Sequence, residues 1–186
     1  VPRFFGGWSF EADMCSDPEF AQTGYEKGVP MGSRLPAAQP GKGGPVFAVS
    51  ALSDPGTERN PGGQLAKIQI IKGWVDDQGA FHQAVHDVAL GPDQAASVDR
   101  STCEPVGGGA RALCGVWQDP DFEPDRDAVY YARVIENPSC RWSRRLCLSL
   151  PEADRPDGCD AGRLPETIQE RAWTSPIWYA VSDQGA

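Results

Sequence analysis

Two histidines, His82 and His86, are the side chains of this sequence best suited by type to hold a metal ion. A four-residue spacing places both on one face of a helix, as in proteases that carry His-Glu-x-x-His. Here Gln83 follows the first histidine and cannot act as a general base. The segment also alternates like a β-strand, in which four residues span about 13 Å, too far for two imidazoles to share one ion. We therefore expect exposed strand histidines in preference to a zinc site.

A ladder of acidic side chains at alternate positions could bind calcium. It comprises Asp119, Asp121, Glu123, Asp125 and Asp127, of which the first four are the calcium candidates. Carboxylates spaced in this way can surround a calcium ion where the backbone bends. However, Pro120 and Pro124 stiffen the segment, and the glycine of EF-hand loops is missing. The simpler interpretation is a solvated corner whose acids cap turns and keep the edge soluble.

The segment from Cys140 to Cys147 is locally basic in an acidic chain. It contains Arg141, Trp142, Arg144 and Arg145. Guanidinium groups beside an aromatic ring suit the recognition of carboxylates or phosphates. One interpretation is docking against an acidic partner or contact with an anionic ligand. The other is a solvated disulfide loop whose arginines pair with neighbouring acids, which is common on surfaces.

Motifs for nucleophilic catalysis or phosphate binding are missing from the sequence. No Gly-x-Ser-x-Gly occurs, so no turn exposes a serine nucleophile in the manner of α/β-hydrolases. The stretch from Gly41 to Pro45 is not a P-loop, because its lysine is followed by glycine and the upstream glycine is missing. We assign no catalytic residue and no cofactor to this chain.

Six cysteines form an even set without a Cys-x-x-Cys pair, which favours disulfides over a zinc or redox site. Disulfides indicate an oxidising location, either the periplasm or the cell exterior. About 15 pairings are possible. We expect Cys103–Cys114 across a glycine-rich loop and Cys147–Cys159 across a Pro/Asp-rich loop, leaving Cys15–Cys140. Reduced, buried cysteines are the alternative.

The elements that must position these residues are β-strands. Period-2 apolar patterns separated by turn residues predict strands over residues 3–10, 45–52, 66–75, 81–89, 112–118, 128–135 and 172–181. Asp76 to Gly79 predicts a hairpin turn between the third and fourth of them. Long loops are expected over residues 11–44, 91–111 and 137–167, and hardly any helix. The whole of 1–186 is expected to form one domain.

A double tyrosine within the strand at 128–135 is typical of an immunoglobulin-like sandwich. In that fold a tyrosine bonds to the backbone of the preceding corner, two residues before the inter-sheet cysteine. Tyr130 takes the corner position and Ala132 the cysteine position, so the core must hold without that bridge. Trp74 could supply the core indole. The expected fold is an all-β, immunoglobulin-like sandwich of about seven strands with long disulfide-tied loops.

Charge and hydropathy limit the partners of this chain. The net charge is −9 over 186 residues, which disfavours binding to nucleic-acid phosphates. No apolar run reaches the roughly 20 residues that cross a bilayer. The N-terminus lacks the regions of a signal peptide and begins as if inside a strand. We therefore expect a fragment or processed product of a longer protein.

Several segments resemble the C-terminal region of the DUF3604 family of bacterial proteins. They are residues 3–8 (RFFGGW), 28–32 (GVPMG), 68–74 (IQIIKGW), 119–124 (DPDFEP), 130–134 (YYARV) and 168–179 (IQERAWTSPIWY). The resemblance implies a metal-dependent hydrolase domain of the PHP type upstream, with two or three ions bound by His and Asp. None of those ligands maps onto this chain, so divalent metals are expected only in that upstream domain.

Two functions follow from these expectations. The first is a non-catalytic accessory sandwich that packs against the phosphoesterase-like, N-terminal hydrolase domain of the same protein. The second is an autonomous secreted or periplasmic module that binds a ligand or a protein. An exposed apolar patch around the first strand, Trp173 and Trp178 would favour the first function. An aromatic pocket walled by this chain alone would favour the second.

Overall fold

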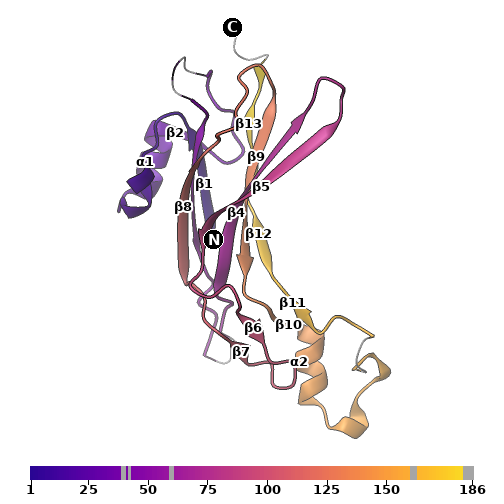
Figure 1. Cartoon of the computed structure of the whole chain (residues 1–186). Coiled ribbons are helices and arrows are strands. Elements are labelled where there is room, and N and C mark those ends of the chain that lie inside the picture. The colour runs from indigo at the N-terminus through magenta and orange to yellow at the C-terminus, as the bar shows by residue number, and fades with distance from the viewer. Residues whose placement is uncertain (39–40, 42, 59–60, 160–162, 182–186) are drawn as a thin grey trace.

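The computed structural model describes residues 1–38, 41, 43–58, 61–159 and 163–181. Two antiparallel β-sheets pack face to face around the main core (Figure 1). Apolar residues alternate along the strands, so each sheet turns one apolar face toward the other. The all-β sandwich predicted from the sequence is confirmed.

The first sheet has the strand order β2–β1–β3–β8. These strands are β2 (Gly28–Pro30), β1 (Pro2–Gly7), β3 (Val46–Leu52) and β8 (Ala112–Gln118). Strand β1 lies inside this sheet between β2 and β3, and four of its six residues are buried. Phe4 and Phe5 of β1 are buried, so the exposed apolar patch that would favour an accessory function does not extend to the first strand.

The second sheet is built around β9 (Ala128–Glu136) and β4 (Leu65–Val75), which pair with each other. The outer edge of β4 pairs with β5 (Phe81–Leu90). The other edge of β9 pairs with two short strands, β12 (Arg171–Trp173) and β13 (Ile177–Tyr179). The last predicted strand is therefore interrupted at residues 174–176, where Pro176 cannot donate a ladder hydrogen bond.

Closely packed rings fill the space between the sheets. Phe47 of β3 lies against Tyr130 of β9, with ring centroids 4.3 Å apart, and both side chains are fully buried. Ile70 and Ile177 are equally inaccessible. Each such side chain contributes about 1.5–3 kcal/mol relative to an exposed position. The core indole is Trp8, whose Nε1 donates to the Pro36 carbonyl, and not Trp74, which is partly exposed.

A helical layer covers the outer face of the first sheet. It consists of the 3-10 helix η1 (Ala12–Ser16) and α1 (Phe20–Lys27). Phe5, Met14 and Ala48 form a second small core under this layer. Gly24 lets α1 approach β1 closely, because a Cβ there would lie only 2.6 Å from Phe5 Cδ2. Residues 11–44, predicted as a loop, thus contain two short helices as well as β2.

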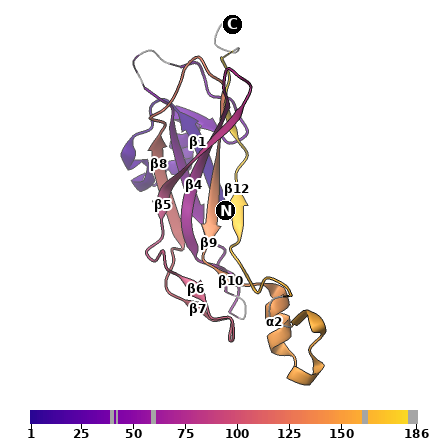
Figure 2. The same cartoon turned by 45° about the vertical axis from the view of Figure 1, so that its right-hand side comes forward.

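The other two predicted loops also contain short elements. Residues 91–111 form a small hairpin of β6 (Ser97–Val98) and β7 (Pro105–Val106). Residues 137–167 carry β10 (Ser139–Cys140), α2 (Trp142–Ser149), and the 3-10 helices η2 (Glu152–Asp154) and η3 (Asp157–Cys159). Strand β10 pairs with β11 (Thr167–Ile168). Figure 2 shows α2 standing away from the sandwich at the end of this ladder.

All six cysteines form disulfides, but two of the three predicted pairings are wrong. Cys147–Cys159 is confirmed. Cys103 pairs with Cys140, and Cys15 pairs with Cys114. The helical layer brings Cys15 across the outer face of the first sheet to β8, which is a long-range effect of folding that sequence spacing does not reveal.

Candidate functional site

Among the residues that the structure describes, no layer covers the outer face of the second sheet in the way that η1 and α1 cover the first. In an antiparallel sheet, directly paired residues point to the same side. The register places Trp178 beside Val129, Trp173 beside Arg133, and Val75 beside Phe81. Five of the large apolar side chains exposed on this face are Val75, Phe81, Val85, Trp173 and Trp178. We call these five residues the apolar face.

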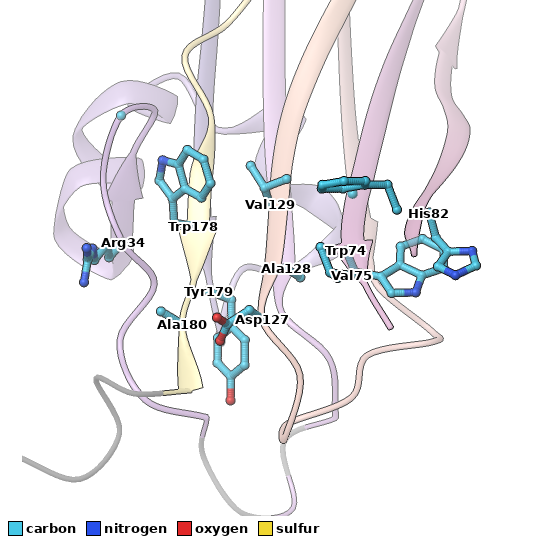
Figure 3. A pocket seen from close by; sticks show the side chains of 13 residues that line it. Arg34, Trp74, Val75, His82, Asp127, Ala128, Val129, Trp178, Tyr179 and Ala180 are labelled. Carbon is cyan, nitrogen blue, oxygen red and sulfur yellow. The ribbon is translucent and has the colours of Figure 1, made fainter. Parts of the chain in front are cut away.

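An open groove of about 710 Å³ lies at one end of the apolar face. Figure 3 shows Trp178 on one side, Trp74 and His82 on the other, and Val129 between them. Gly73 in the lining lets Val129 approach the backbone of β4 closely, since a Cβ there would lie 3.1 Å from Val129 Cγ1. An aromatic pocket walled by this chain alone would favour an autonomous binding module. The groove is aromatic, but it is open along the sheet and is not a walled pocket.

The Trp74–His82 pair at the groove is held rigidly by its neighbours. The two rings stack with centroids 5.4 Å apart. His82 Nε2 lies 2.7 Å from Asp76 Oδ2, and the ammonium of Lys72 lies 5.5 Å from the centre of the indole ring. The hydrogen bond with His82 and those from the turn backbone lower the pKa of Asp76. The hairpin therefore presents a fixed aromatic platform to the groove.

A polar ladder crosses the same face of the sheet. Gln69 Nε2 donates to Asp87, and Arg133 donates from Nε and Nη2 to Gln69 Oε1. The bond from Gln69 lowers the pKa of Asp87, and Lys67 adds to this effect. The ladder fixes side chains of three adjacent strands beside Trp173, so the surface offered to a partner is pre-ordered.

Asp119, the first of the calcium candidates, lies buried in a hydrogen-bonded network. Its Oδ2 is 2.6 Å from Lys72 Nζ and accepts a 2.7 Å bond from the Tyr130 hydroxyl. Its Oδ1 accepts from the backbone N–H of Asp121. Burial and the adjacent carboxylate raise the pKa of Tyr130. This carboxylate anchors the corner to the sheet and is not directed toward an ion.

Asp121, Glu123 and Asp127 line the same small hollow as Asp119, but two of them have partners of their own. The Glu123 carboxylate pairs with Arg126, and Asp127 accepts from the backbone N–H of Val181. Over the described ranges, no group of three or more His, Cys, Asp or Glu side chains has the arrangement of a metal site. The calcium hypothesis for Asp119, Asp121, Glu123 and Asp125 stays a prediction, and Asp119 already has the ammonium group of Lys72 as its partner.

The two histidines occupy separate places on β5. His82 stacks on Trp74, whereas His86 stacks on Trp117 of the first sheet with ring centroids 4.5 Å apart. The strand conformation predicted for this segment is confirmed. Each imidazole thus has an aromatic neighbour of its own.

The backbone bond predicted for Tyr130 at the corner is wrong. Tyr130 bonds to the side chain of Asp119, whereas the backbone of the corner is reached by Tyr179, whose hydroxyl donates to the Pro124 carbonyl at 2.7 Å. Burial, followed by Asp125 and Asp127, raises the pKa of Tyr179. Two tyrosines on adjacent strands therefore divide the role that one was expected to perform.

The arginines of the basic segment have unequal surroundings. Arg144 is paired with Glu166 at 3.2 Å and donates from Nε to the Arg100 carbonyl. Its neighbours Arg141, Trp142 and Arg145 lie at the start of α2, and Trp142 is 74 % exposed. The prediction that local acids would pair with the arginines thus holds for Arg144.

Glu136 at the far end of β9 makes stability depend on pH. Burial, then the nearby charges of Glu170 and Asp54, raise the pKa of its carboxyl. A raised pKa means that the folded state binds the proton more tightly than the unfolded state does, so ionisation above that pKa destabilises the fold. We expect Glu136→Gln to raise the melting temperature at pH 7 and to leave it unchanged below about pH 4, where the wild-type carboxyl is protonated. Thermal melts at both values check this, and equal gains at both would contradict it.

Sequence reasoning found Trp173 and Trp178 but missed Val75, Phe81 and Val85 on the same face. The signal was available, because the alternation of β5 places Phe81 and Val85 on the side opposite the two histidines. A strand with apolar residues on its solvent face is unusual for an isolated sandwich.

The comparison with protein families decides the relationship of this chain. A family model described as "Protein of unknown function (DUF3604)" matches residues 1–181. The chain belongs to the DUF3604 family. No curated protein and no solved structure matched it. The apolar face, the groove and the buried Lys72–Asp119–Tyr130 network all lie within the part that the DUF3604 model covers.

Proposed function

We propose that this DUF3604 chain is a non-catalytic accessory domain that packs against a PHP-type, metal-dependent hydrolase domain N-terminal to it. The observation that carries this proposal is the unequal covering of the two sheets. The first sheet is buried under η1 and α1, whereas the second exposes the apolar face. Exposed apolar patches of this kind mark interaction sites, and tryptophans dominate binding energies there.

The charge and chemistry of the described residues agree with a supporting role. The acids form hydrogen bonds and ion pairs that order turns and strands, as Asp76 and Asp87 do. The divalent ions would be bound by the hydrolase domain, and this chain would supply a rigid surface. In this proposal the chain is the C-terminal part of a longer protein, in the periplasm or outside the cell. Three disulfides are compatible with that location.

Titration calorimetry between this chain and the upstream domain, produced separately, tests the proposal. We expect Trp173→Glu and Trp178→Glu each to weaken binding at least tenfold, because each places a charge in the buried interface. The matched control is Val106→Glu, since Val106 is equally exposed but lies on β7, away from the apolar face. Affinities that all three substitutions leave unchanged would show that the apolar face is not the interface. Hydrolysis of phosphoesters by this chain alone with divalent metals would contradict an accessory role.

The groove favours a second candidate function, an autonomous module that binds a small molecule or glycan. Trp74, His82 and Trp178 offer flat rings, and Arg34 and Asp127 add polar groups at its edges. Such a mixture of aromatic surface and a few polar groups is typical of ligand sites. In the part of the chain that the structure describes, no helix is long and apolar enough to span a bilayer.

Fluorescence titration with neutral oligosaccharides of several linkages tests this second function. Saturable binding that Trp74→Ala abolishes and Trp142→Ala preserves would support it. Binding to the upstream domain, blocked by Trp178→Glu, together with no response to any sugar, would favour the accessory domain.

A further inference from the structure

We propose that the α2 lobe, residues 139–159 and 163–168, is a docking element for an acidic protein segment. This surface is separate from the apolar face of the second sheet, so the inference does not depend on the proposed function. It rests on the position of the lobe, the way it is braced, and the side chains that α2 exposes.

The lobe stands away from the sandwich on the side of the second sheet (Figures 1 and 2). A helix so placed gains little from the main core. The one buried residue of α2 is Cys147, which forms a disulfide with Cys159 inside the lobe. Helices of eight residues are marginal in water without tertiary support. The Cys147–Cys159 disulfide supplies part of the support that α2 lacks from the main core.

Several bonds fix the base of the lobe. Cys140 is joined to Cys103 of the hairpin loop that follows β6, and β10 pairs with β11. The Arg141 amide donates to the Glu166 carbonyl, and the Arg144 guanidinium pairs with the Glu166 carboxylate. A rigid element loses little conformational entropy on binding, so this bracing is what a recognition surface requires.

The exposed side of α2 carries an apolar ridge. Trp142 is 74 % exposed and Leu146 is 51 % exposed. They are four residues apart, so they lie one above the other on one face of the helix, with Arg145 beside them. Tryptophan and arginine are the residue types that contribute most to protein interfaces.

The charge of α2 determines the kind of partner. Residues 141–149 contain three arginines and no acid, within a chain of net charge −9. Glu166 neutralises Arg144, whereas no described acidic side chain pairs with Arg141 or Arg145. An acidic surface that also offers an apolar pocket would satisfy both the guanidinium groups and the Trp142–Leu146 ridge.

A protein partner is favoured over a nucleic acid. Arg141 and Arg145 are few for a polyanion, whose extended phosphate backbone would also run over the acidic surface beyond α2. A short segment can stay within reach of α2. A short acidic peptide segment presents carboxylates and apolar side chains together, and only these match the ridge and its flanking charges.

The test uses the whole chain, isotope-labelled for NMR, and a short synthetic peptide of Glu, Leu and Phe with its lysine-containing twin. We expect saturable shifts confined to α2 and the Trp142 indole N–H with the acidic peptide, and none with its twin. Trp142→Ala and Arg145→Glu should each weaken binding at least tenfold. Arg3→Glu, the same charge change on an exposed residue of β1, should leave the affinity within twofold.

Each other outcome overturns the inference. Equal binding of both peptides, or shifts spread over the sandwich, would show unspecific attraction. Affinity unaffected by Trp142→Ala and Arg145→Glu would exclude the ridge. No saturable binding of the acidic peptide would exclude an acidic segment as the partner. Tighter binding of a single-stranded oligonucleotide at α2 would show that the partner is a nucleic acid. Trp142 and Arg145 are exposed, so both variants should have the melting temperature of the wild type. A melting curve confirms that they fold.

Discussion

Lys72→Met is expected to lower the free energy of unfolding of this chain by about 3–5 kcal/mol. The reason is the buried carboxylate of Asp119, which would lose its partner 2.6 Å away and remain charged in the core. The Asp121 carbonyl would lose its 2.7 Å bond from the same ammonium group. Chemical denaturation followed by tryptophan fluorescence measures the loss. A decrease below about 1 kcal/mol would contradict it, because surface ion pairs are worth no more than that.

A second variant separates the unpaired charge from the lost methylene packing. In Lys72→Met with Asp119→Asn, the side chain at position 119 is neutral. Its carbonyl oxygen can still accept from the Asp121 amide, and its NH2 group can donate to the Tyr130 hydroxyl oxygen. The double variant should therefore recover much of the stability lost in the single one. If the double variant is less stable than Lys72→Met, the packing and hydrogen-bond geometry of the network stabilise the fold, and the unpaired charge is not the cause of the loss. Tyr130→Phe, which removes only one donor, should cost about 1–3 kcal/mol.

The sheets could be predicted because strand signals are local. The alternation from residue 66 to 75 and the turn at Asp76 to Gly79 define β4 and β5 almost to the residue. The unbroken apolar run Val46 to Val49 predicts a central strand, and all four residues are buried on β3, which lies between β1 and β8. Such patterns need no knowledge of what lies across the core.

The helical layer could not be predicted, because its cause is not local. Helix α1 is short and contains Gly24, which lowers helix propensity. It forms because Phe20 and Tyr25 pack their rings against Phe5 of β1. The sequence shows these aromatic residues, but only the fold brings the two segments together.

In the candidate site, too, some residues could be predicted from the sequence and others could not. Trp173 and Trp178 were suspected as an interface, and the register places both on the uncovered face. The role of Asp119 was not foreseen, since a ladder of acids gives no sign of which carboxylate will be buried. Its burial follows from Lys72, 47 residues earlier, which points inward because it shares the parity of Ile68 and Ile70.

Removal of the Cys15–Cys114 disulfide is expected to have the other large effect. The bond closes a loop of 99 residues and ties η1 to β8 across the first sheet. Linking such distant positions restricts the unfolded chain strongly, and loss of a native disulfide typically costs about 2–5 kcal/mol. Cys15→Ala with Cys114→Ala should therefore lower the free energy of unfolding by this amount. The measurement is denaturation of the oxidised protein, with the two remaining disulfides verified by mass spectrometry.

Cys147→Ala with Cys159→Ala is the matched control, because it also removes one disulfide but closes only 12 residues within the α2 lobe. The lobe lies outside the main core, so it can open before the sandwich unfolds, and its bond then contributes little to the global transition. We expect a change of less than about 1 kcal/mol in the main transition, with faster amide exchange in α2. Equal losses from both pairs would mean that the lobe and the sandwich unfold as one unit. In that case the α2 ridge would be held by the core as well as by its disulfides.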